Sequence, residues 1–84
     1  MTPRPGFINN MAVSYNGVLV DPGRSIRRCR TNLMMSQAEV AKKASLSPSY
    51  LSRLELNKAG VASMATYAKV ARAMGITLDQ LFGF

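Results

Sequence analysis

The sequence predicts an all-α domain of five short helices around one core, preceded by a short β-hairpin. Apolar residues repeat at helical spacings of three and four along most of the chain. An Asn-Gly dipeptide separates two β-favouring runs near the N-terminus. With 84 residues, the chain suffices for one modest core. Helix-start signals precede four of the expected helices, at Ser36, Ser47, Ser63 and Thr77.

The N-terminal residues 1–22 are expected to form an arm that is distinct from a helical domain at 23–84. Residues 1–10 are rich in proline and asparagine and lack any period. Residues 12–20 contain Asn16-Gly17, which suits both positive-φ positions of a type I′ turn and predicts a hairpin. A lone hairpin is marginally stable. Three outcomes stay open: it packs on its own helices, pairs with another copy, or is disordered.

The first helix is expected from about 24 to 32, and Asp21-Pro22-Gly23 separates it from the hairpin. Its basic side faces solvent, and the opposite side faces the core. The basic residues are Arg24, Arg27 and Arg28, and the inward residues are Ile26, Cys29 and Leu33.

Residues 37–56 are the most informative stretch of the chain. Ser36, with Glu39 three residues later, forms a capping box for the second helix. Ser47 followed by Pro48 starts the third helix. This pattern predicts a helix-turn-helix, which presents its second helix to the DNA major groove. The small or apolar inward positions are Val40, Ala41, Ala44, Leu46, Leu51 and Leu54.

Two further helices are expected near the C-terminus. Ser63 caps the fourth helix, and Gly75 ends it in the left-handed conformation. Thr77 caps a short fifth helix. Their apolar residues are Met64, Tyr67, Ala71 and Met74, followed by Leu78, Leu81 and Phe82.

The chain is strongly basic, with 11 Lys and Arg against 4 Asp and Glu and a net charge of +7. Residues 24–58 carry +6 of this charge. Such a concentration of positive charge indicates a polyanionic partner, most often nucleic acid. The alternative is a solvated basic surface. We favour double-stranded DNA because the helix-turn-helix pattern lies within the basic segment.

Several classes of protein are excluded by composition. Cys29 is the only cysteine and there is no histidine, so an internal disulfide, a Cys/His zinc site and His-based catalysis are excluded. We expect a cytoplasmic protein with no enzyme activity, cofactor or metal. No apolar run approaches the roughly 18 residues needed to span a bilayer, so no membrane partner is expected.

Four motifs in this chain point to a known family. They are Ser36-Gln37-x-x-Val40-Ala41, Leu46-Ser47, Tyr50-Leu51-Ser52-Arg53-Leu54-Glu55 and Ala71-x-Ala73-Met74-Gly75-Ile76-x-Leu78. Together they resemble the lambda-repressor/Cro-like (XRE-type) DNA-binding domains over about residues 23–82. The Gly-Ile-Thr-Leu exit makes the match more specific than a bare two-helix pattern. The resemblance implies the five-helix lambda-repressor-like fold.

The resemblance also implies a set of DNA contacts. In relatives, the glutamine that opens the second helix binds a phosphate; the alternative for Gln37 is an ordinary helix residue. Arg53 is expected to read a base, because a guanidinium bonds guanine O6 and N7 together; the alternative is a phosphate contact. The full set is Gln37, Ser47, Pro48, Ser49, Tyr50, Ser52, Arg53, Asn57 and Lys58.

The other implied contacts have weaker chemistry. The serine hydroxyls suggest water-mediated readout, and Pro48 offers only apolar contact, for instance to a thymine methyl. Tyr50 either contacts a phosphate or packs beside the second helix. Asn57 and Lys58 follow the third helix, where the family's loop meets the DNA backbone.

Arg30 and Glu55 match an internal ion pair in some relatives, which ties the first helix to the end of the third. If buried, its loss costs roughly 3–5 kcal/mol; the alternative is that Arg30 joins the basic outer face. Ser45 and Asn57 stand where the family often has glycine. Asparagine tolerates positive φ better than serine, so we expect local strain at Ser45.

The expected function is a sequence-specific transcriptional regulator, a repressor that binds an inverted-repeat operator as a homodimer through residues 48–56. One helix reads too few base pairs alone. The dimer interface is expected at Leu81, Phe82 and Phe84, or at the hairpin; alternatively, Phe82 closes the core and Phe84 frays. The alternative function is a protein–protein module or antitoxin-type protein, whose main partner is another protein.

Overall fold

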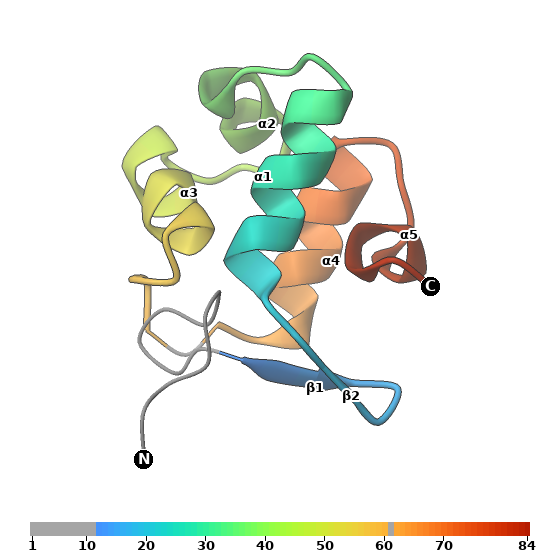
Figure 1. The fold of residues 1–84 in the computed structure, drawn as a ribbon. Coiled ribbons are helices and arrows are strands. Elements are labelled where there is room, and N and C mark those ends of the chain that lie inside the picture. Colours follow the sequence, from blue (N-terminus) through green and yellow to red (C-terminus); the bar gives the residue numbers. More distant parts are fainter. Residues whose placement is uncertain (1–11, 61) are drawn as a thin grey trace.

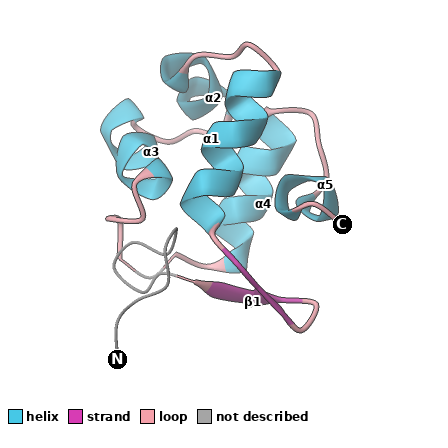
Figure 2. Cartoon of the chain, viewed as in Figure 1, coloured by secondary structure: helices cyan, strands magenta, loops and turns pink. Residues whose placement is uncertain are grey.

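The structure is a computed structural model that describes residues 12–60 and 62–84; the arm expected at 1–10 lies outside these ranges. Helices α1 and α4 cross the centre, with α2 and α3 on one side and α5 on the other (Figures 1 and 2). No described helix is long and apolar enough to cross a membrane. The elements are β1 (Val13–Tyr15), β2 (Val18–Val20), α1 (Pro22–Asn32), α2 (Gln37–Lys43), α3 (Pro48–Glu55), α4 (Met64–Ala73) and α5 (Leu78–Phe82).

Every helix begins at a side-chain cap. Four caps are those that the sequence predicts, and each accepts a backbone N–H from three residues later. The fifth is Asp21, whose carboxylate accepts the Arg24 N–H at 3.1 Å. Pro22 occupies the first helical turn, where a missing N–H costs nothing. Helix α1 therefore begins two residues before the expected start at Arg24, because Pro22 and Gly23 belong to its first turn.

The core lies where the five helices meet. Most of the inward positions expected in α2 and α3 are buried, and Leu46 is half-buried. Leu33 is an exception with 45% of its surface exposed, because it follows the last turn of α1 and caps that helix. Its expected inward position is wrong. The fully buried residues include Ile26, Val40, Ala41, Leu51, Val70 and Leu81.

Several turns use residues with a β-carbon in the left-handed conformation. Asn16 and Gly17 have φ values of +52° and +77°, as the predicted hairpin turn requires. Ser45, at φ +58°, carries the expected strain. Met34, at φ +57°, was not anticipated. This conformation costs an ordinary residue about 1 kcal/mol. At Met34 and Ser45 it allows the next residue to close the helix end, because the Met35 N–H donates to the Arg30 carbonyl and the Leu46 N–H to the Ala41 carbonyl.

The hairpin packs on its own domain, which is the first of the three outcomes left open above. Val13 pairs with Val20 and Tyr15 with Val18 in antiparallel register. The Tyr15 ring centre lies 4.9 Å from that of Phe82. The Tyr15 hydroxyl donates to the Asp79 carboxylate, and this bond raises the pKa of Tyr15. The hairpin is thereby attached to α5.

Helix α5 closes the core of its own chain. Leu81 is fully buried, and Phe82 is 7% exposed, with its ring against that of Tyr67. The expectation that Leu81 and Phe82 form a dimer interface is wrong, because the core already covers both side chains. Phe84 is 51% exposed and packs one side of its ring on Tyr15, so it keeps surface for a partner.

Candidate nucleic-acid interface

Helix α3 lies at the edge of the domain, on the far side of α1 from α5 (Figure 1). Leu51 and Leu54 anchor one side of the helix in the core. The opposite side is polar and solvent-facing: Ser49 and Arg53 are exposed, and Ser52 is half-buried. The second helix of the motif therefore presents polar and basic groups to solvent.

The first turn of α3 combines capping with exposed hydroxyls. The Ser47 hydroxyl accepts the Tyr50 N–H at 3.1 Å and lies 3.4 Å from the Ser49 hydroxyl. Pro48 is exposed beside them. One acceptor site of Ser47 is thus used to hold the helix start, while Ser49 stays accessible.

Tyr50 and Arg53 lie one turn apart on α3 and contact each other. The Arg53 guanidinium carbon is 5.9 Å from the centre of the half-buried Tyr50 ring, a cation–π arrangement. The aromatic ring limits the conformations of an otherwise exposed guanidinium. Tyr50 packs in the domain, as one of its two expected roles requires, and it also orients Arg53.

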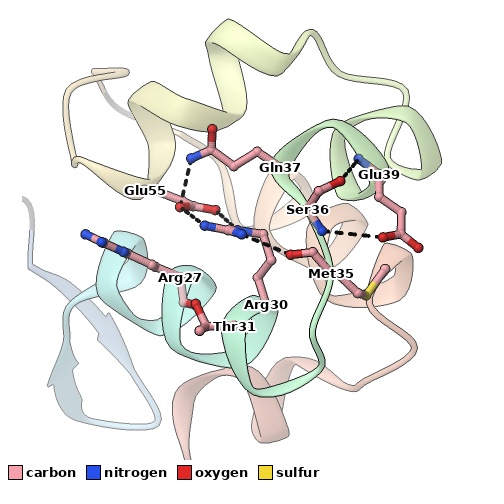
Figure 3. Close-up of polar contacts among 8 residues, drawn as sticks. All are labelled: Arg27, Arg30, Thr31, Met35, Ser36, Gln37, Glu39 and Glu55. Atoms are coloured by element: carbon pink, nitrogen blue, oxygen red, sulfur yellow. Dashed lines mark hydrogen bonds and ion pairs between the residues drawn. The ribbon is translucent and has the colours of Figure 1, made fainter.

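An ion pair between Arg30 and Glu55 joins α1 to the last turn of α3 (Figure 3). Arg30 Nε lies 2.6 Å from Glu55 Oε2, and Arg30 Nη2 lies 3.0 Å from Oε1. The third nitrogen, Nη1, donates to the Met35 carbonyl at 2.9 Å. The hydrogen bond to Glu55 raises the pKa of Arg30. The two side chains are 16% and 3% exposed, so Arg30 does not belong to the basic outer face.

Gln37 extends this cluster instead of pointing to solvent. Its side-chain Nε2 donates to Glu55 Oε1 at 3.0 Å, and the residue is half-buried (Figure 3). The amide that the resemblance assigns to a DNA phosphate is therefore bonded within the chain. A phosphate contact by Gln37 stays a prediction for its backbone N–H.

Asn57 faces inward and its side chain is bonded within the chain, so a DNA contact by this residue stays a prediction for its backbone alone. It is 6% exposed, and its backbone has φ +57°. Its Oδ1 accepts the Gly23 N–H at 3.0 Å, and its Nδ2 donates to Asp21 at 2.7 Å. The residue after α3 thus fastens that helix to the start of α1. Lys58, the next residue, is exposed and keeps its expected accessibility.

Gly23 makes this contact between α1 and the end of α3 possible, a role that the sequence did not predict. A β-carbon on Gly23 would lie 2.5 Å from the Leu54 carbonyl oxygen and 2.6 Å from Asn57 Oδ1. Real β-carbons essentially never come so close, so only glycine fits. The sequence signals were an Asp-Pro-Gly start to α1 and an asparagine in a glycine position, but nothing in the sequence paired them.

Helix α3 exposes basic side chains, Arg53 and Lys58 just after it, and is held from behind by the Arg30–Glu55 ion pair. This arrangement is that of a helix-turn-helix protein. Proteins of this class place the second helix of the motif in the major groove. The profile of the helix-turn-helix family matches residues 26–81, and the chain belongs to this family.

Solved structures agree with this fold. The restriction-modification controller protein C.Esp1396I has a TM-score of 0.68 and 19% identity over 76% of this chain and 83% of its own. For the clp gene regulator ClgR from C. glutamicum, the values are 0.67 and 27%, over 74% and 78%. For the hypothetical transcription factor NHTF from Neisseria, they are 0.66 and 28%, over 75% and 71%. No curated protein matches the sequence.

Proposed function

We propose that this protein is a sequence-specific transcriptional regulator, a repressor that binds an inverted-repeat DNA operator as a homodimer. The observation that carries the proposal is the position of α3, whose inner side is held by the core and by Glu55 while its outer side is accessible. Membership of the helix-turn-helix family supports DNA binding. The descriptions of ClgR as a gene regulator and of NHTF as a hypothetical transcription factor support regulation.

The proposed readout is centred on Arg53, whose exposed guanidinium bonds a guanine edge in the major groove. Ser49 and Ser52 contribute weaker contacts through hydroxyls and bridging water. Pro48 lies against a thymine methyl. Lys58, just after α3, binds a backbone phosphate and fixes the register without reading sequence.

Dimerisation follows from the small number of base pairs that one α3 can read. The proposed interface consists of Phe84 and the hairpin residues Val18 and Leu19, which are each about half exposed. The stretch 80–84 and the hairpin have no Lys, Arg, Asp or Glu side chain, so two copies of a +7 chain meet there with little repulsion. We also propose a cytoplasmic location, where DNA is accessible and the free Cys29 stays reduced.

Selection of bound sequences from a random duplex pool tests this function. We expect a palindromic site whose half-sites lie about 10 base pairs apart or a multiple of that spacing, bound by two copies in sedimentation. Failure to enrich any sequence would overturn the proposal and favour a protein partner instead.

Arg53→Ala then tests the readout on the selected site. It should weaken binding to that site by about 1–3 kcal/mol and relax selectivity at one base position. Arg28→Ala is the matched control, because Arg28 lies toward α5 with its guanidinium 3.4 Å from the Leu81 carbonyl. Equal weakening on the selected and random duplexes would make Arg53 a phosphate contact.

A further inference from the structure

A cleft borders the outer surface of α3 at the point where α1 and the start of α2 approach it. Its volume is about 240 Å³. The cleft shares only Ser52 with the DNA contacts proposed above, which otherwise lie on the outer side of α3 and just after it. Its lining residues are Arg27, Arg30, Gln37, Ser52, Glu55 and Leu56.

The charges in this cleft do not balance. Arg30 and Glu55 neutralise each other, and the Gln37 amide is bonded to the same carboxylate. Arg27 is exposed, and within residues 12–60 and 62–84 it has no carboxylate at ion-pair distance. In Figure 3 the Arg27 guanidinium points away from the Arg30–Glu55 pair, and no dashed line joins it to either residue. One uncompensated positive charge therefore remains at the mouth of the cleft.

The donors that remain suit an oxyanion. A guanidinium offers parallel N–H groups that match two oxygens of a phosphate. Ser52, whose hydroxyl can also donate, lines the same cleft from α3. Because Ser52 also belongs to the outer side of α3, a duplex seated on that helix brings a backbone phosphate close to the cleft.

We propose that Arg27 binds a backbone phosphate of duplex DNA at the mouth of this cleft, with Ser52 as a second donor. The inference rests on the proposed function and extends the DNA surface from α3 onto α1. Arg27 takes over the side-chain phosphate contact that Gln37 does not make, since the Gln37 amide is directed to Glu55. The contact positions the protein and carries no sequence information.

The salt dependence of binding tests this role with neighbouring arginines. Each phosphate contact contributes about 0.9 to the slope of log affinity against log salt concentration. Arg27→Ala should lower the slope by about 0.9 for each subunit, or about 1.8 for the proposed dimer, and weaken the selected and random duplexes alike, by roughly tenfold per contact. Arg27→Lys should retain most of the slope. Arg28→Ala removes the same charge from the α5 side of α1 and should leave the slope unchanged.

A second experiment removes the charge of one DNA phosphate at a time. Duplexes with a single uncharged methylphosphonate are scanned along the selected site. One position in each half-site should weaken the wild-type protein but not Arg27→Ala, because the contact is already absent in that variant. The melting temperature of Arg27→Ala should stay within about 3 °C of wild type, which separates binding from folding.

Two results would overturn the proposal: equal slopes for Arg27→Ala and Arg28→Ala, or the same methylphosphonate sensitivity in wild type and Arg27→Ala at every position. In both cases the wild type still binds DNA and the proposed function stands. A wild-type protein that binds no duplex would refute the proposed function and this inference together.

Discussion

Both sides of α3 carry polar groups, but the groups on the two sides differ in how they are hydrogen-bonded. At the inner side, Glu55 accepts from Arg30 and Gln37, and Asn57 just beyond the helix bonds Gly23 and Asp21. At the outer side, exposed hydroxyls and a guanidinium face solvent. A polar residue in this motif is therefore structural where its hydrogen bonds are satisfied within the chain. It is a candidate for reading DNA where they are not.

The largest effect is expected from Glu55→Ala. It leaves the Arg30 guanidinium largely buried without its carboxylate and removes the acceptor of Gln37. The free energy of unfolding, measured by chemical denaturation, should fall by roughly 3–5 kcal/mol. Arg53→Ala, two residues earlier on the outer side, should change it by less than about 0.5 kcal/mol. Equal losses in the two variants would erase the distinction between the two sides.

Gly23→Ala should have the next largest effect. The added β-carbon meets the Leu54 carbonyl oxygen, which is backbone and cannot rotate away. The start of α1 must then move from the end of α3, at a cost of about 1–3 kcal/mol in the free energy of unfolding. Asn32→Ala, at the exposed other end of α1, serves as control. A Gly23→Ala protein as stable as its control would mean that the approach of the two helices is not constrained.

The smallest effect on stability is expected when two residues of nearly equal φ are each replaced by glycine. Asn57 and Ser45 have φ values of +57° and +58°. Ser45→Gly should raise the melting temperature, because it relieves strain worth about 1 kcal/mol at an exposed side chain. Asn57→Gly should lower it, because the bonds to Gly23 and Asp21 outweigh the same relief by about 1 kcal/mol. A shift of the same sign in both variants would contradict a structural role for the Asn57 side chain.

The sequence predicted the features that depend on neighbours within about four residues. Four helix caps, the Asn16-Gly17 turn and most inward apolar positions of α2 and α3 are of this kind. The family resemblance added the proximity of Arg30 and Glu55, which residue spacing alone does not provide. These features are local or belong to a shared fold, so a single chain reveals them.

The direction of a polar side chain was not predictable where a distant residue decides it. Asn57 turns inward because Gly23, thirty-four positions earlier, presents a buried N–H. Gln37 turns toward Glu55 for a similar reason. Phe82 is covered because Tyr15 and Tyr67 pack on its ring, and neither neighbour is close in sequence. Composition and periodicity contain no information on such pairings.

Asp21 belongs to two units at once: its backbone continues the hairpin, while its carboxylate caps α1 and holds Asn57. A fragment excised at residue 23 would lack this carboxylate, so the first helix would fray and the end of α3 would lose an anchor. A fragment of this domain that is fused to another protein should therefore begin at residue 12, so that it includes the hairpin and Asp21. The segment before the first helix is therefore a structural part of the DNA-binding unit.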